Sequence, residues 1–137
     1  AAHQAVADSI ARRAVTLLRD SAAIVPLAPA ADVTVLTYAP EADVVAGRAF
    51  AAELRLRFPR ARVVRVGTRP FPADLAALAA SLDSTKRLVV TTHVRTIEGE
   101  GRPAVAPEVA TWVDSIARRV PTAVVAFGNP YVVRQFP

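Results

Sequence analysis

The sequence has no cysteine, only two histidines and no long apolar run, and each absence excludes a class of function. Without cysteine there is no disulfide scaffold, no thiolate nucleophile and no cysteine-based zinc site. His3 and His93 are too few for a histidine-rich centre, so we expect no metal. Arg, Asp and Glu interrupt every apolar stretch before the roughly 20 residues that a membrane-spanning helix needs, so we expect no membrane span.

Glycine-rich binding loops are also missing. Five glycines are present, and none has the spacing of the dinucleotide fingerprint or of the phosphate-binding P-loop. There is no Gly-x-Ser-x-Gly turn, so the nucleophile of the α/β-type serine hydrolases has no counterpart. We therefore expect no nucleotide bound by these devices and no cofactor.

The composition indicates one globular domain. The chain has 137 residues, 53% of them hydrophobic and 21% charged, which predicts a single domain over residues 1–137 with a core of its own. The formal charge of +5 raises the question of nucleic acid. All but one of the 17 basic residues are arginine, the exception being Lys86, which is typical of a compositional bias. We do not expect nucleic acid to be the partner.

The first part of the chain reads as a helix followed by a linker. Residues 2–19 carry apolar side chains at helical spacing, with arginines elsewhere around the helix. Ile24-Val25-Pro26-Leu27-Ala28-Pro29 favours an extended segment lying against a hydrophobic surface, because each proline disfavours helix in the residue before it. Residues 1–31 are thus expected to form an opening helix and a linker segment.

From residue 32 onward, strand and helix patterns alternate. We expect strands at 33–38, 62–67, 87–93 and 122–127, and helices at 40–58, 72–82 and 108–120 and from residue 130. This alternation predicts an α/β fold, a three-layer α/β/α sandwich with a mostly parallel sheet. Ligands of such folds bind at the carboxyl ends of the strands.

Four residues at those strand ends are candidates for a site. Glu98 lies in the glycine-containing loop after the third strand and is a candidate for acid–base catalysis, although acids in such loops are usually only solvated. His93 closes the third strand, where a histidine is usually hydrogen-bonded to the adjacent loop. Arg95 and Asn129 follow the expected third and fourth strands and are the other two candidates for contact with a ligand.

An alternative reading rests on arginine. A basic cluster spans a helix end and the following strand and consists of Arg55, Arg57, Arg60, Arg62, Arg65 and Arg69. If these side chains share a face, the chain is a free-standing α/β binding module for an anionic ligand or nucleic acid. Only Phe58 and Phe71 accompany them as possible stacking platforms, so a solvated surface is the commoner interpretation.

Two end segments resemble a known family. Residues 9–27, with the core Ala-Val-Thr-Leu-Leu, and residues 123–137, with Phe-Gly-Asn-Pro-Tyr, are similar to parts of the C-terminal domain of glycoside hydrolase family 3. The Phe-Gly-Asn-Pro-Tyr motif at 127–131 is similar to the β-N-acetylglucosaminidase branch. In that family the helix and its following segment link a catalytic (β/α)₈ barrel to an α/β sandwich.

The resemblance implies that catalysis lies outside this chain. Family members are retaining hydrolases, and in this branch the barrel carries both the Asp nucleophile and a His-Asp acid/base pair. The chain is then an accessory domain, a fragment of a larger two-domain protein, and inactive alone. Its partner is the missing barrel, and through it a carbohydrate. The resemblance favours a periplasmic or extracellular location.

One residue keeps a catalytic alternative open. In the β-glucosidase branch of the family, the acid/base Glu comes from the sandwich domain, from the loop after a strand comparable with residues 87–93. Glu98 is the residue of this chain that the resemblance carries over to that role. It would complete an active site on a barrel that lies upstream or on a separate chain.

Overall fold

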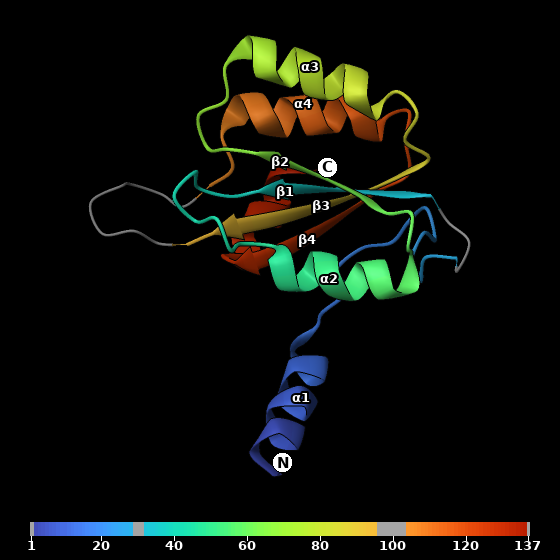
Figure 1. Ribbon diagram of the computed structural model, residues 1–137, viewed down its shortest axis with the longest axis vertical. Helices are drawn as coiled ribbons and strands as arrows, with labels where there is room; N and C mark the ends of the chain where they lie inside the picture. Colours follow the sequence, from blue (N-terminus) through green and yellow to red (C-terminus); the bar gives the residue numbers. More distant parts are fainter. Residues whose placement is uncertain (1, 29–31, 96–103, 137) are drawn as a thin grey trace.

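The computed structural model describes residues 2–28, 32–95 and 104–136 (Figure 1). The elements follow one another as α1 (Ala2–Ala14), β1 (Val33–Tyr38), α2 (Arg48–Arg57), β2 (Arg62–Val66), α3 (Pro72–Leu82), β3 (Arg87–Val94), α4 (Pro107–Ala117), β4 (Thr122–Gly128) and the 3₁₀ helix η1 (Pro130–Gln135). The expected strands are confirmed to within one residue at each end.

The four described strands form one parallel sheet in the order β2-β1-β3-β4. In the middle of the sheet, Leu36 of β1 lies opposite Val64 of β2 on one side and Val90 of β3 on the other. Every residue of β1 is buried, as the sequence of β-branched and apolar residues predicts for a central parallel strand. The mostly parallel α/β architecture is confirmed.

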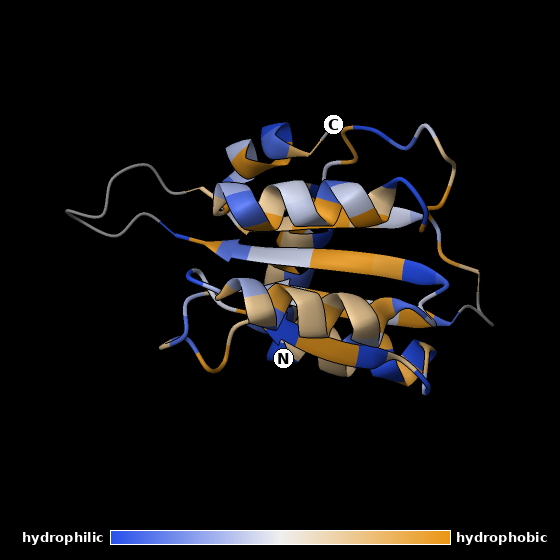
Figure 2. Ribbon diagram, turned by 90° about the horizontal axis from the view of Figure 1, so that it is seen from above, coloured by the Kyte–Doolittle hydropathy of each residue, from blue (hydrophilic) through white to orange (hydrophobic). Residues whose placement is uncertain are grey.

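Helices cover both faces of the sheet. Helices α3 and α4 lie on one face and α2 lies on the other (Figure 1). The first face holds the larger core, in which Leu36 and Val90 pack with Val113 and Ile116 of α4. The second holds a smaller core around Val35, Leu54 and Phe58, to which Leu27 of the linker is added. Figure 2 shows long hydrophobic stretches along the strands between these layers.

Helix α1 stands away from this body (Figure 1). The expected helix over residues 2–19 is too long, because α1 ends at Ala14 and residues 15–20 are not helical. Val15 and Thr16 are β-branched and lose side-chain freedom in a helix, which favours an end there. The carboxylate of Asp20 then accepts hydrogen bonds from the backbone N–H groups of Ile24 and Val25 and fixes the turn into the linker.

Helix α2 begins later than the apolar pattern predicts. We expected a helix from Pro40 that would include Val44 and Val45, but residues 41–46 form turns and both valines are exposed. Gly47 precedes the first residue of α2 and has φ of 77°, a left-handed conformation that ends the turn and starts the helix. The helix expected from residue 130 is a 3₁₀ helix.

In the described part of the chain, no helix is both long enough and apolar enough to cross a membrane.

Candidate functional site

The sheet topology marks one place where a ligand site is expected. The chain moves from β1 to β2 on one side and then crosses to β3 on the other side of β1. The carboxyl ends of β1 and β3 are therefore the topological switch point, where open parallel sheets bind their ligands. The turn at residues 39–47 follows β1, and Arg95 follows β3.

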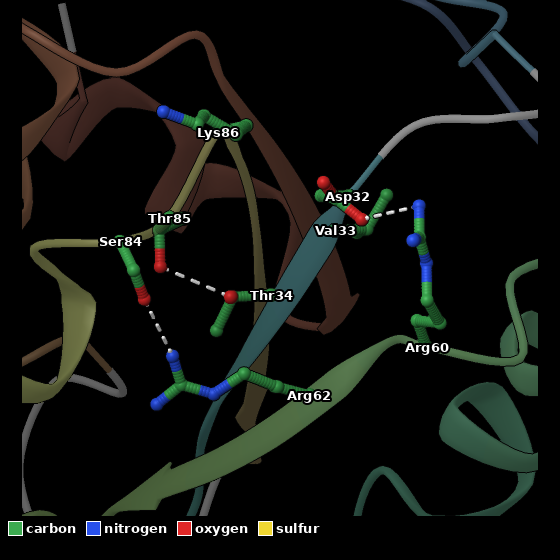
Figure 3. A pocket seen from close by; sticks show the side chains of 8 residues that line it. All are labelled: Asp32, Val33, Thr34, Arg60, Arg62, Ser84, Thr85 and Lys86. Atoms are coloured by element: carbon green, nitrogen blue, oxygen red, sulfur yellow. Dashed lines mark hydrogen bonds and ion pairs between the residues drawn. The ribbon is translucent and has the colours of Figure 1, made fainter.

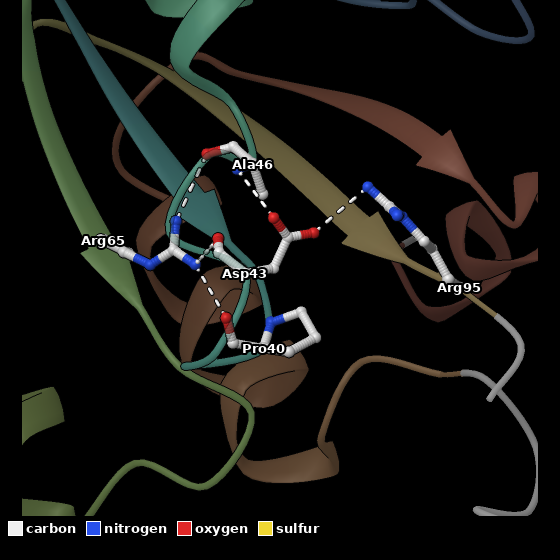
Figure 4. Close-up of polar contacts among 5 residues, drawn as sticks. All are labelled: Pro40, Asp43, Ala46, Arg65 and Arg95. Carbon is white, nitrogen blue, oxygen red and sulfur yellow. Dashed lines mark hydrogen bonds and ion pairs between the residues drawn. The ribbon is translucent and has the colours of Figure 1, made fainter.

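Arg65 of β2 holds the turn after β1 in place (Figure 4). Its guanidinium donates hydrogen bonds to the carbonyl oxygens of Pro40 at 2.8 Å, Asp43 at 2.7 Å and Ala46 at 3.3 Å. Three acceptors on one planar guanidinium fix the path of the turn, because the geometry of its donors is rigid. The turn is thus a preorganised part of the site.

Asp43 joins this turn to the third strand (Figure 4). One oxygen of its carboxylate accepts the backbone N–H of Ala46 at 3.1 Å, and the other pairs with the Arg95 guanidinium at 3.2 Å. The ion pair spans the switch point between β1 and β3. Asp43 is only one-fifth exposed, while Arg95 reaches over it from solvent.

Gly47 allows the turn to lie directly on the sheet. A Cβ atom at this position would stand 2.8 Å from Cγ2 of Thr37 and 3.3 Å from Nε2 of His93. The hydroxyl of Thr37 accepts a hydrogen bond from the buried hydroxyl of Thr91, so this polar pair is satisfied inside the sheet. A larger residue than glycine would lift the turn away from both strands.

His93 lies beneath this turn. Its ring stacks on Phe127 with the centroids 4.9 Å apart, and Phe127 in turn meets Phe50 edge to face. Nε2 of His93 is buried and has no hydrogen-bond partner among the residues that the structure describes. Burial lowers the pKa of His93, Arg65 and Arg95 lower it further, and Asp43 acts in the opposite direction. Burial behind the turn therefore disfavours the charged imidazolium form.

The other residues expected at the ligand edge have different surroundings. Arg95 lies at the edge and pairs with Asp43. The side chain of Asn129 accepts a hydrogen bond from the backbone N–H of Tyr131 and so caps η1. Glu98 lies outside the described residues. The structure therefore brings His93 and Arg95 together around Asp43, while Asn129 serves the turn after β4.

Both carboxylates of the turn after β1 are engaged within the chain. Glu41 accepts hydrogen bonds from the hydroxyl of Thr68 and from the backbone N–H of Arg69. Its own backbone N–H is the main cause that lowers the pKa of Glu41; burial acts in the opposite direction, and the hydrogen bonds from Thr68 and Arg69 lower the pKa further. With Asp43 also engaged, these two acids position loops. Within residues 2–28, 32–95 and 104–136, no three potential ligand side chains gather as a metal site.

A shallow pocket lies at the opposite edge of the sheet, where the strands begin (Figure 3). Its volume is about 200 Å³, and Arg60, Arg62 and Lys86 are among its lining residues. The guanidinium of Arg62 donates to the hydroxyl of Ser84 and to the carbonyl of Ser81, and Arg60 pairs with Asp32 at 2.9 Å. In Figure 3 the Arg60 and Lys86 side chains point away from each other.

The arginine cluster expected from the sequence is divided between the two edges. Arg62 bonds to the end of α3 at the edge where the strands begin, whereas Arg65 bonds to the turn at the edge where they end. A continuous track for a phosphate backbone needs these side chains on one face, and this pair does not provide it.

Sequence reasoning missed Asp43, Gly47 and Arg65 as parts of the site. The sequence gives no local signal for Arg65, because it is an exposed residue of the edge strand β2, where a solvated arginine is ordinary. The partners themselves are backbone carbonyls about 20 residues away in the sequence, and no local pattern marks them.

Comparisons of this chain with models of protein families, with curated proteins and with solved structures give no match.

Proposed function

We propose that this chain is an accessory α/β domain of a retaining glycoside hydrolase of family 3, of the β-N-acetylglucosaminidase type. It packs on a catalytic (β/α)₈ barrel that another part of the protein supplies. The proposal starts from the resemblance of residues 9–27 and 123–137 to the family's C-terminal domain. The three-layer fold is the architecture that this resemblance implies.

A contact between the two similar segments carries the proposal. The guanidinium of Arg19, in the first segment, donates a hydrogen bond of 3.0 Å to the carbonyl oxygen of Phe136, in the second. The two residues are 117 positions apart in the sequence. Segments that resemble the same domain and also meet in space support one domain type better than two isolated matches do.

The exposed N-terminal segment gives further support. Val6, Ile10, Leu17 and Leu18 are all at least 59% exposed, although they form the apolar positions of the segment. A 13-residue helix whose residues 3–14 are all exposed is only marginally stable in water. Such a segment is best explained by packing against a neighbouring domain.

The test is hydrolysis of chromogenic β-N-acetylglucosaminide and β-glucoside. We would compare this chain alone with the protein encoded by its complete reading frame. We expect activity only in the complete protein and preference for the N-acetylglucosaminide. Activity of the chain alone would contradict the assignment of catalysis to the barrel, and inactivity of both would remove the glycosidase proposal.

The role of the N-terminal segment is tested in the complete protein. Replacing Leu17 and Leu18 by serine removes apolar area from the surface expected to meet the barrel, so heat inactivation should become faster. Leu56→Ser is the matched control, because Leu56 is equally exposed but lies on the outer side of α2. Equal inactivation rates for the two variants would contradict docking through this segment.

A second candidate, the anion-binding module, is favoured by the pocket with Arg60, Arg62 and Lys86. Binding of inorganic phosphate or single-stranded DNA there would weaken steeply as salt is added. Docking through apolar surface would not weaken in this way. Saturable binding that Lys86→Ala and Arg62→Ala abolish would put this candidate ahead of the glycosidase domain.

A further inference from the structure

Exposed apolar side chains gather at the carboxyl edge of the sheet. Among the described residues from 32 onward, six large hydrophobic side chains are exposed, and five of them belong to this edge: Val44 and Val45 after β1, Phe71 after β2, and Phe127 and Tyr131 at the end of β4. The sixth, Leu56, lies on α2. Single exposed apolar residues are ordinary, but five at one edge of a sheet mark an interaction surface.

The backbone that presents these side chains is fixed. Val44 and Val45 sit in the turn that Arg65 clamps through three carbonyl groups. The backbone N–H of Phe71 donates to the carboxylate of Asp74 at the start of α3. The guanidinium of Arg134 lies 5.4 Å from the ring centre of Tyr131. Rigid presentation lowers the entropy lost on association and favours binding.

The charges at this edge are unequally engaged. Glu41, Asp43 and Asp74 all accept hydrogen bonds or an ion pair from within the chain. Arg48, beside the two exposed valines, and Arg69, beside Phe71, have no side-chain partner among the described residues. Among the described carboxylates of this edge, Glu108 is exposed without such a partner, and Glu98 and Glu100 lie outside the described residues. Free guanidinium groups beside apolar side chains fit a partner with an apolar centre and carboxylates around it.

We propose that the carboxyl edge of the sheet, defined by Val44, Val45, Phe71 and Tyr131 with Arg48 and Arg69, docks on an acidic face of a folded protein domain. That this domain is the catalytic barrel rests on the proposed function. The surface itself follows from the exposure, rigidity and charge of these residues. It is separate from the N-terminal segment and from the pocket at the opposite edge.

Because the chain has no cysteine, single introduced thiols can report on coverage of this surface. We would prepare the complete protein with Val45→Cys or with Leu56→Cys and follow maleimide labelling of each peptide by mass spectrometry. Both native side chains are exposed in this structure. Docking should slow labelling at position 45 by about tenfold or more relative to position 56, and urea should equalise the rates. Equal rates in the native protein would overturn the proposal.

Charge reversal tests the acidic character of the partner. Arg48→Glu together with Arg69→Glu should speed labelling of the Val45→Cys protein about threefold or more, because it sets like charges against each other. Arg57→Glu, at the far end of α2, is the matched control and should leave the rate unchanged. If labelling at position 45 stays equally slow after the double charge reversal, the proposal of an acidic partner face is wrong. If the protection of position 45 decreases when the protein is diluted, the surface binds a second copy of the chain, and the proposal that it docks on the barrel is wrong.

The outcome is independent of the glycosidase assay. If position 45 is protected in a protein that hydrolyses neither substrate, the docking surface stands and the proposed function fails. If the complete protein is an N-acetylglucosaminidase and position 45 labels freely, the proposed function stands and the docking surface fails.

Discussion

The two edges of the sheet differ in what they expose. The edge where the strands end carries exposed apolar side chains on turns that Arg65, Asp43 and Glu41 hold in place. The edge where the strands begin carries a shallow pocket with charged side chains, and its ion pair between Arg60 and Asp32 is largely exposed. Both edges are rich in arginine, but Arg65 binds three backbone carbonyl groups at the first edge, whereas Arg62 binds one at the second.

The difference shows that arginine has two roles in this fold: Arg65 binds backbone carbonyl groups, and Arg60 forms an exposed ion pair. Arg65 gives three of its five N–H donors to backbone carbonyl groups of one turn. Arg60 is paired with one carboxylate in solvent, where such a pair contributes little to stability. A basic composition is therefore not by itself an indication of an anionic partner.

The comparison predicts that backbone changes at the carboxyl edge are the most damaging. Gly128→Ala should lower the free energy of unfolding by about 2–4 kcal/mol, because φ is 93° and the new Cβ would meet the backbone carbonyl oxygen of Val94. Urea unfolding measures the loss.

Gly67→Ala, at the end of β2 on the same edge, is the comparison and should cost less, about 1–2 kcal/mol. Its φ lies outside the left-handed region, and its Cβ would meet the side chain of Glu41, which can move if it gives up its hydrogen bonds with Thr68 and Arg69. Equal costs would contradict the strain assigned to the left-handed backbone at Gly128.

Removing the arginine clamp should have the next largest effect. Arg65→Ala should lower the free energy of unfolding by about 1–3 kcal/mol, because three carbonyl groups lose a charged donor. Hydrogen exchange should also become faster in residues 40–47. Arg62→Ala removes two exposed bonds at the other edge, whereas Arg65 makes three bonds of which the one to Ala46 is half-buried, so the Arg62 change should cost about 0.5–1 kcal/mol. A larger loss for Arg62 would reverse the comparison.

The sequence predicted the strands that end at this edge better than the exposed turns that follow them. The strands were predicted to within one residue because buried parallel strands require runs such as Val33–Tyr38 and Arg87–Val94. The start of α2 was predicted too early, because Val44 and Val45 continue an apolar helical pattern although they lie on an exposed turn. Periodicity does not distinguish an apolar side chain in a core from one on a docking surface.

The site was less predictable, for a physical reason. The contacts of Asp43 with Arg95 and of Arg65 with the turn depend on the strand order, which places β1 between β2 and β3. The alternation of strands and helices predicts a parallel sheet but leaves that order open. His93 was correctly placed at a strand end, but its burial under Gly47 depends on the conformation of a turn that was expected to be helical.

The third prediction concerns pH, and its effect is smaller. Because burial lowers the pKa of His93, the unfolded chain binds its proton more readily than the folded one. The contribution of His93 to the free energy of unfolding is therefore fully present above a pH of about 6.5. It is lost as the pH falls through the lower pKa that His93 has in the folded protein. Urea unfolding between pH 7.5 and 5.5 should show this decline, and His93→Gln should flatten it. An unchanged slope in the variant would assign the decline to other groups.

The smallest effect is expected at the edge where the strands begin. Arg60→Ala removes an ion pair whose side chains are 78% and 57% exposed, so the free energy of unfolding should change by less than about 0.5 kcal/mol. The attraction is weak because water screens both charges, and holding two long side chains together costs conformational entropy. Urea unfolding at low and at high salt measures it. A loss above about 1 kcal/mol would mean that this pair shapes its edge as Arg65 shapes the other, and the contrast between the two edges would disappear.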